Sequence, residues 1–236
     1  IAYNDLCATT SNTYTFVFRV SDDFCPAPAV NIITVSITVL AWDVVPPPSL
    51  RCISVLPNGD VTLSWIPPPD PDNRFNSYHI YQSATEAGPY TVVDSIFNIN
   101  TTTYTHVGAG ANVASLYYYV RTRSGCNGNV FTEPSDTLQT ILLDVTNPGT
   151  GSAALNWNPI STPPPATTNT GYYRIYREFP AGTWTLIDST QNLTYEDEIT
   201  LCDAFINYRV EIDDESGCTS VSSIDGDLFQ DLTPPA

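Results

Sequence analysis

An internal repeat constrains the fold of this chain more than any other feature. The block Asp60-Val61-Thr62-Leu63-Ser64-Trp65 corresponds in pattern to Ser152-Ala153-Ala154-Leu155-Asn156-Trp157. Four more matches follow in the same order, at one spacing of about 90 to 95 residues. They pair Tyr78-His79-Ile80-Tyr81 with Tyr173-Arg174-Ile175-Tyr176, Val93-Asp94-Ser95 with Ile187-Asp188-Ser189, Thr103-Tyr104 with Thr194-Tyr195, and Tyr118-Tyr119-Val120 with Tyr208-Arg209-Val210. The chain therefore contains two copies of one structural unit.

The repeated blocks have the alternation of β-strands. Val61, Leu63 and Trp65 would share one face of a strand. Proline-rich and glycine-rich segments such as Pro67-Pro68-Pro69-Asp70-Pro71 and Pro163-Pro164-Pro165 separate the blocks. About seven short strands in about 95 residues are typical of a β-sandwich. We therefore predict an all-β fold with sandwiches at residues 46–143 and 144–236.

The first 45 residues contain two further amphipathic strands. Each would present four apolar side chains on one face: Tyr14, Phe16, Phe18 and Val20 on the first, and Ile33, Val35, Ile37 and Val39 on the second. A lone hairpin is marginally stable in water. Residues 1–45 are therefore predicted to be the C-terminal hairpin of a preceding β-sandwich, whose other strands lie upstream or come from a partner.

Several positions within each repeat resemble those of the fibronectin type III family. A tryptophan ends the second strand, a Tyr-x-Ile strand follows a proline-rich loop, and a Tyr-x-Val strand comes near the end. Leu201-Cys202 stands six residues before Tyr208, where the family usually has a leucine in its tyrosine corner, whereas the first repeat has Asn112 six residues before Tyr118. The resemblance implies tandem immunoglobulin-like (fibronectin type III) β-sandwiches and brings no catalytic residue with it.

The segments Cys52–Val61 and Cys202–Val210 also resemble modules of very large, type IX-secreted surface proteins of gliding bacteria. That resemblance suggests O-glycans at Asp-Ser/Thr-hydrophobe sites, which here are Ser95, Thr137 and Ser189. The alternative is that these hydroxyls are ordinary turn residues. Asn100 and Asn192 begin N-glycan sequons by pattern only.

Six cysteines occur without a Cys-x-x-Cys motif or a histidine at zinc spacing, which favours disulfides and an extracellular or cell-surface location. In a fibronectin-like sandwich the start of the first strand and the loop between the last two strands lie at the same end, so we predict a disulfide between Cys52 and Cys126. A predicted strand of about 20 Å separates Cys7 from Cys25 and Cys202 from Cys218. A disulfide needs α-carbons within about 7 Å. We therefore expect these four cysteines to have partners in other modules or to be buried thiols.

The chain is strongly acidic, with a formal net charge of −17 and eight basic residues, all of them arginines. This balance disfavours a nucleic-acid partner and an anionic membrane surface, and no apolar run is long enough for a membrane span. The acidic loop residues Asp70, Asp72, Asp213 and Asp214 are candidates for Ca²⁺, but the oxygen spacing of a dedicated calcium loop is missing. We expect no cofactor, with Ca²⁺ as the open alternative.

Few residues suit catalysis. The two histidines, His79 and His106, fall in different strands of one repeat, and no nucleophile elbow, phosphate loop or zinc-protease motif occurs. We interpret the loop carboxylates as solvated turn residues rather than as a catalytic pair whose environment shifts one pKa. Tyr117 and Tyr119 could stack on a sugar or a neighbouring chain, or simply pack across strands. We therefore expect the chain not to be an enzyme.

These observations predict non-enzymatic structural and adhesive spacer modules of a large secreted or cell-surface protein. Their expected partners are neighbouring β-domains of the same long chain, other copies in a fibre, and surface glycans. Two alternatives stay open: accessory modules of a secreted polysaccharide-degrading enzyme, and a dedicated carbohydrate-binding module.

Overall fold

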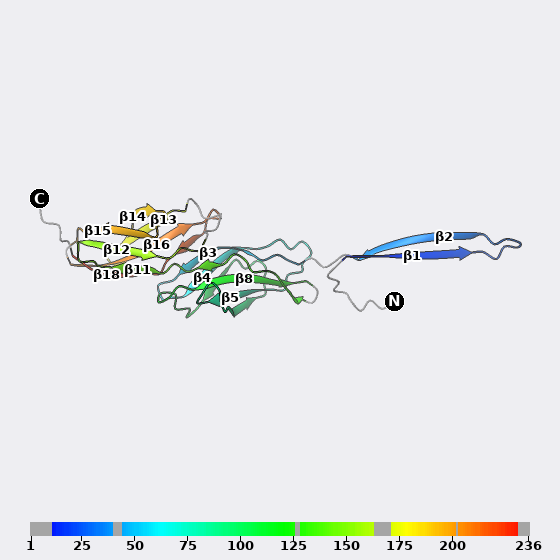
Figure 1. Cartoon of the computed structure of the whole chain (residues 1–236), viewed down its shortest axis with the longest axis horizontal. Coiled ribbons are helices and arrows are strands. Elements are labelled where there is room, and N and C mark those ends of the chain that lie inside the picture. Colours follow the sequence, from blue (N-terminus) through cyan, green and yellow to red (C-terminus); the bar gives the residue numbers. More distant parts are fainter. Residues whose placement is uncertain (1–10, 40–43, 126–127, 163–170, 202, 231–236) are drawn as a thin grey trace.

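The computed structural model describes residues 11–39, 44–125, 128–162, 171–201 and 203–230. Within these ranges every regular element is a β-strand, and the strands form one hairpin and two sandwiches (Figure 1). The predicted all-β fold with tandem sandwiches is therefore confirmed. Among the described residues, no helix is long and apolar enough to cross a membrane.

The first sandwich contains two antiparallel sheets. One sheet has the order β3-β4-β7, with β3 at Ser49–Val55, β4 at Val61–Ile66 and β7 at Thr103–His106. The other has the order β6-β5-β8-β10, with β9 also paired to β8. Its strands are β5 (Ser77–Ser83), β6 (Thr91–Ile96), β8 (Tyr117–Ser124), β9 (Val130–Phe131) and β10 (Leu138–Gln139). The last strand of the sandwich is thus split into two pieces.

The second sandwich repeats this plan strand for strand. Its three-stranded sheet is β11-β12-β15, with β11 at Leu143–Thr146, β12 at Ser152–Trp157 and β15 at Thr194–Glu198. Its second sheet is β14-β13-β16-β17, with β18 also paired to β16. These strands are β13 (Tyr173–Glu178), β14 (Trp184–Thr190), β16 (Ala204–Asp213), β17 (Thr219–Val221) and β18 (Asp225–Phe229). The sequence repeat is therefore a repeat of structure.

Each core contains the same pair of aromatic side chains, a tryptophan and a tyrosine. In the first sandwich the Trp65 and Tyr78 rings meet edge to face, with centroids 5.6 Å apart. In the second, Trp157 and Tyr173 meet at the same distance and in the same arrangement. All four side chains are buried. Because large aromatic side chains contribute most of the apolar area in such cores, this pair explains why Trp and Tyr recur at matched positions.

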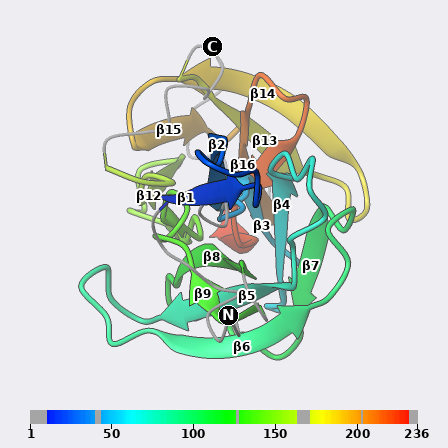
Figure 2. The same cartoon turned by 90° about the vertical axis from the view of Figure 1, so that its right-hand side faces the viewer.

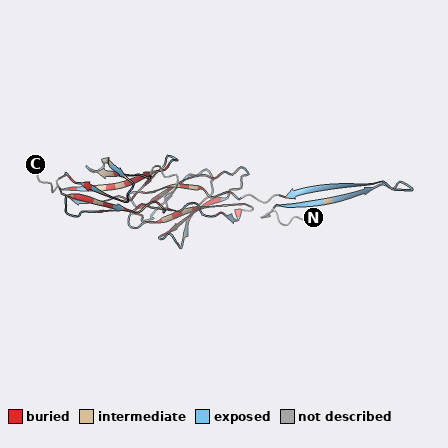
Figure 3. Ribbon diagram, turned by 45° about the horizontal axis from the view of Figure 1, so that its top comes forward, coloured by how far each residue is buried: buried red, intermediate tan, exposed pale blue. Residues whose placement is uncertain are grey.

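The N-terminal hairpin consists of β1 (Asn12–Ser21) and β2 (Val30–Val39), paired over their full length. The register places Tyr14 opposite Ile37, Phe16 opposite Val35 and Phe18 opposite Ile33, which gives the predicted apolar face. Thr13 opposite Thr38 belongs to the other face. Both faces are largely exposed within the described residues (Figure 3).

Candidate functional site: the module junction

The two sandwiches meet along two sheet edges. Strand β3 ends the sheet order of the first sandwich, and β17 ends that of the second. The Ile53 N–H donates to Ser220 Oγ at 3.0 Å, and Ser54 Oγ–H donates to the Thr219 carbonyl at 3.0 Å. Viewed end on, the sandwiches lie on opposite sides of the long axis (Figure 2), as an edge contact requires. Exposed edge strands attract foreign strands, and here each edge covers the other.

A disulfide between Cys52 and Cys218 ties these edges together, with α-carbons 6.2 Å apart. Cys52 lies within β3, and Cys218 directly precedes β17. The predicted Cys52–Cys126 disulfide is therefore wrong. The expectation that Cys218 has its partner in another module is confirmed.

The physical reason lies in the alternation of β3. Ile53 and Val55 point into the core, whereas Cys52 pairs across the strand with Ser64 on the opposite face of the sheet. That face points toward the second sandwich, where Cys218 lies. Cys25 is an exposed free thiol, which neither expected alternative describes. Cys7, Cys126 and Cys202 lie outside the described residues.

The connection between the sandwiches is buried rather than flexible. Thr140 and Ile141 are both fully buried. Asn158 of the second sandwich donates from Nδ2 to the Thr140 carbonyl at 2.9 Å and accepts the Leu142 N–H at Oδ1 at 2.9 Å. The Ser223 N–H donates to the Ile141 carbonyl at 2.9 Å. This segment therefore has no hinge of the kind that solvated linkers provide.

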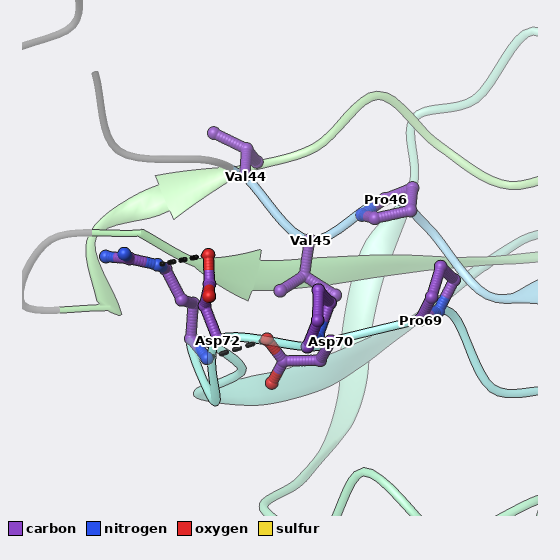
Figure 4. A pocket seen from close by; sticks show the side chains of 8 residues that line it. Val44, Val45, Pro46, Pro69, Asp70 and Asp72 are labelled. Atoms are coloured by element: carbon purple, nitrogen blue, oxygen red, sulfur yellow. Dashed lines mark hydrogen bonds and ion pairs between the residues drawn. The ribbon is translucent and has the colours of Figure 1, made fainter. Parts of the chain in front are cut away.

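The entry to the first sandwich is also tied down. The Val45 N–H donates to Ser124 Oγ at 3.0 Å, and Thr122 Oγ1–H donates to the Pro46 carbonyl at 2.9 Å. A shallow pocket of about 190 Å³ lies here, between this segment and the loop from Pro69 to Arg74 (Figure 4).

The calcium candidates Asp70 and Asp72 border this pocket, but their carboxylates have other partners. Asp70 accepts the backbone N–H of Arg74 at 2.7 Å and that of Phe75 at 2.9 Å. Asp72 lies 3.6 Å from the Arg74 guanidinium (Figure 4). The pair therefore shapes its own loop.

Asp213 and Asp214 follow the same pattern in the second sandwich. Asp213 accepts hydrogen bonds from Arg174 and Thr219, both at 2.7 Å, and Asp214 accepts the Ser216 N–H at 2.9 Å. Among the described residues no group of three or more His, Cys, Asp or Glu could hold a metal ion. Calcium binding remains a prediction without geometric support.

Each sandwich has a tyrosine hydroxyl that bonds across its two sheets. Tyr118 on β8 bonds to His106 Nδ1 on β7 at 2.8 Å, and Tyr208 on β16 donates to Asp197 Oδ2 on β15 at 2.7 Å. A tyrosine corner would instead use a backbone carbonyl. Burial raises the pKa of both phenols. Sequence reasoning missed these partners, although His106 and Asp197 follow the matched Thr-Tyr blocks at the same interval.

Both histidines belong to the first sandwich, so we predict that its stability alone depends on pH near neutrality. Burial lowers the pKa of His79 and His106, an effect that nearby Arg123 reinforces at His79 and Asp60 partly offsets at His106. The unfolded chain then binds more protons, and stability is lost as pH falls through the unfolded value of about 6.5.

Native-state hydrogen exchange at pH 8 and pH 5.5 measures this difference. The free energy of opening at β8 should fall with pH, whereas that at β16 should change much less because the second sandwich has no histidine. The double variant His79→Gln/His106→Gln should remove most of the excess loss at β8. An equal loss at both strands would refute the assignment to histidine.

The suggested O-glycan sites differ in access. Ser189 is exposed, Ser95 Oγ bonds to His79 Nδ1 at 3.0 Å, and Thr137 is half-buried beside Tyr90. O-glycosylation remains a prediction at all three. Tyr119 stacks on Tyr81 with ring centroids 4.8 Å apart, which bears out cross-strand packing.

No protein-family model and no curated protein matches the chain. Solved structures give weak similarities. A two-domain fibronectin type III segment of chicken tenascin is 15% identical, with 78% of this chain and 99% of that chain covered and a TM-score of 0.32. Chicken CNTN1 FN1–FN3 domains are 13% identical, with 92% and 77% covered and a TM-score of 0.32. A β-1,2-glucanase from Parabacteroides distasonis is 18% identical, with a TM-score of 0.35, over 47% of this chain and 15% of that chain.

The present chain thus spans about one seventh of the glucanase. Because these scores are low, the assignment of fold rests on strand order and register rather than on the similarities. The described segments between residues 44 and 230 form two β-sandwiches of the fibronectin type III-like type, joined edge to edge by a disulfide.

Proposed function

We propose that this chain is a stiff structural and adhesive spacer within a large secreted or cell-surface protein. The observation that carries the proposal is the junction, where a disulfide, edge hydrogen bonds and a buried connection join two sandwiches. Tandem domains with small polar interfaces usually move relative to one another. The cross-link and the buried connection oppose that motion and would preserve the reach of the molecule.

Two features support an exported protein. A disulfide between two edge strands needs an oxidising environment to persist, and a strongly acidic surface keeps a long array soluble and extended. We place the protein outside the cytoplasm on these grounds. Export by the type IX pathway is part of the proposal and rests on the sequence resemblance alone.

The hairpin β1–β2 is proposed to belong to a further sandwich. Its uncharged apolar face includes Phe16, Phe18, Ile33 and Val35, and a two-stranded sheet with such a face is marginal without a covering layer. The covering strands would come from upstream residues or from a partner. The hairpin would then be the third module of one array.

A replacement experiment in the native protein tests the spacer role. A spacer acts through length and stiffness, so replacing residues 44–230 by an unrelated rigid tandem of the same length should preserve the distance between the segments that flank these residues. A flexible Gly/Ser segment of equal residue number should shorten that distance and make it variable. If the flexible segment holds the flanking segments at the same fixed distance, the stiffness of these sandwiches contributes nothing to reach.

We predict no hydrolysis of glycans or peptides by the purified chain. An activated nucleophile or a carboxyl group with a tuned pKa would be required, and the structure gives the loop carboxylates arginine and backbone partners instead. Product analysis with a panel of polysaccharides and peptides is the measurement. Turnover that is lost on substitution of a residue within 1–236 would contradict the prediction.

A further inference from the structure

The two sandwiches carry opposite charges at matched positions on the outer face of one sheet. In the second sandwich Arg174 on β13 lies opposite Glu211 on β16. In the first sandwich the matched pair is His79 on β5 and Arg121 on β8. The second sandwich neutralises its arginine with ion pairs from Arg174 to Glu211 at 3.0 Å and to Asp213 at 2.7 Å. The first sandwich has arginine where the second has carboxylate.

This exchange leaves a basic strip on an acidic molecule. Arg121 and Arg123 project from the same face of β8, two residues apart, and among the described residues neither forms an ion pair. Arg123 lowers the pKa of nearby His79, and no carboxylate contributes to that shift. Such a strip is unexpected on a chain with a net charge of −17, and it attracts anionic groups.

The two guanidinium groups are held in place. Both lie 5.5 Å from the centre of the Phe131 ring. Arg121 donates from Nε to the Thr132 carbonyl, and Arg123 donates from Nη2 to Asn129 Oδ1 at 2.8 Å. The Nη groups of Arg121 have no hydrogen-bond partner among the described residues. An arginine fixed in this way loses little side-chain entropy when it binds a carboxylate or a similar anion.

Tyrosines continue the strip along the same two strands. Tyr119 lies two residues before Arg121 on the same face of β8, and Tyr81 lies opposite Tyr119 on β5. The Tyr90 ring packs against that of Tyr119, with centroids 4.6 Å apart. All three are half-buried, and the hydroxyl groups of Tyr81 and Tyr119 have no hydrogen-bond partner among the described residues. They are left for solvent or for a ligand.

We propose that this strip, formed by His79, Tyr81, Tyr119, Arg121, Arg123 and Phe131, binds an anionic polysaccharide that carries carboxylate groups. The arginines would pair with carboxylates, and the tyrosines would contact sugar rings and hydroxyls. The proposal deepens the adhesive part of the proposed function by naming a ligand class and its site. It is independent of the stiffness of the junction.

A glycan suits the strip better than an acidic protein surface does. The strip is narrow and runs along two strands of a sheet. Its arginines can pair with carboxylates, and the tyrosine rings and hydroxyls beside them can contact sugar rings and their hydroxyl groups. The two classes of partner are separated by experiment.

Binding of the whole chain to polygalacturonate oligosaccharides, measured by calorimetry at 20 mM and 300 mM NaCl, tests the proposal. We expect binding that weakens at the higher salt concentration. Each of the single variants Arg121→Gln and Arg123→Gln should weaken it about tenfold, since a charge-assisted hydrogen bond contributes about 1.5 kcal/mol. Because the two variants are made separately, the test stays informative if one of them does not fold.

Arg174→Gln/Arg209→Gln is the matched control, because it removes two positive charges from the equivalent sheet of the second sandwich. It should bind within about twofold of the parent. Equal weakening by the control, equal competition by polyglutamate, or no binding to the acidic glycan would each overturn the proposal. So would a dimer in sedimentation that dissociates on the Arg121→Gln change, because a second copy would then occupy the strip. None of these results would bear on the spacer role.

Discussion

Stretching the oxidised chain by its two ends should release none of the length stored between Cys52 and Cys218. The disulfide joins residues 166 positions apart in the sequence. Tension therefore passes from β3 through the sulfur atoms to β17, and the segment between them lies outside the path of force. Fully extended, that segment would measure about 550 Å at 3.3 Å per residue. The Cys52–Cys218 disulfide therefore acts as a clasp. It would make the two sandwiches almost inextensible even if their cores had only ordinary mechanical strength.

Single-molecule force spectroscopy measures this length directly. The Cys52→Ser/Cys218→Ser variant should release close to the full length as its sandwiches unfold. Cys25→Ser, which removes an exposed thiol that lies outside the clasp, should behave as the parent does. In solution the double variant should also be less stable, by up to about 5 kcal/mol in the chain-entropy model. Release of the full length by the oxidised parent would show that the clasp does not bear the tension.

Asp197→Ala should destabilise the second sandwich by about 2 to 4 kcal/mol. The Asp197 carboxylate accepts the hydroxyl of Tyr208, which is fully buried, and pairs with Arg177 at 3.0 Å. Removing one partner of a buried charged network leaves the others unsatisfied, which costs more than the net value of the pair. The midpoint of urea unfolding, followed by Trp157 fluorescence, reports the change.

The first sandwich provides the matched comparison. His106→Ala removes the neutral partner of Tyr118 and should cost about 1 kcal/mol, the value of one ordinary hydrogen bond. Tyr208→Phe leaves the Arg177–Asp197 pair in place and should also cost less than Asp197→Ala. Equal losses for Asp197→Ala and His106→Ala would mean that the charge on Asp197 contributes nothing.

The sandwiches could be predicted because their signals are local and repeated. Alternation of Val61, Leu63 and Trp65 determines which face of β4 is buried, and the same alternation in β12 sets the second core. The hairpin pairing followed from the same rule. Such patterns depend on a side-chain period of two, which the sequence shows directly.

The junction could not be predicted in the same way, because its contacts join residues distant in the sequence and depend on how two modules are placed. Yet one local signal was available. The alternation that turns Ile53 and Val55 inward also turns Cys52 and Ser54 outward, and both outward residues contact the second sandwich. The predicted Cys52–Cys126 disulfide considered only the end of the sandwich at which each cysteine lies. It did not consider which face of β3 the Cys52 side chain occupies.

The cross-sheet tyrosine contacts were missed for a different reason. The repeat aligned Tyr118 with Tyr208, but it gave no indication that their partners would be a histidine and a carboxylate from the opposite sheet. Similarly, the charge exchange between Arg121 and Glu211 became visible only when the strand registers fixed which residues face one another. Aligning the two repeats identifies residues that they share, but it gives no role to side chains that differ between them.

If the junction is stiff, residues 44–230 reorient in solution as one body, which residual dipolar couplings measure. Backbone amides in β4, β5 and β8 sense the orientation of the first sandwich, and those in β12, β13 and β16 sense that of the second. In the oxidised protein a single alignment tensor should fit both sets, with equal magnitude and direction. Two tensors of different magnitude would show that the sandwiches reorient independently, and the account of a clasped spacer would then be wrong.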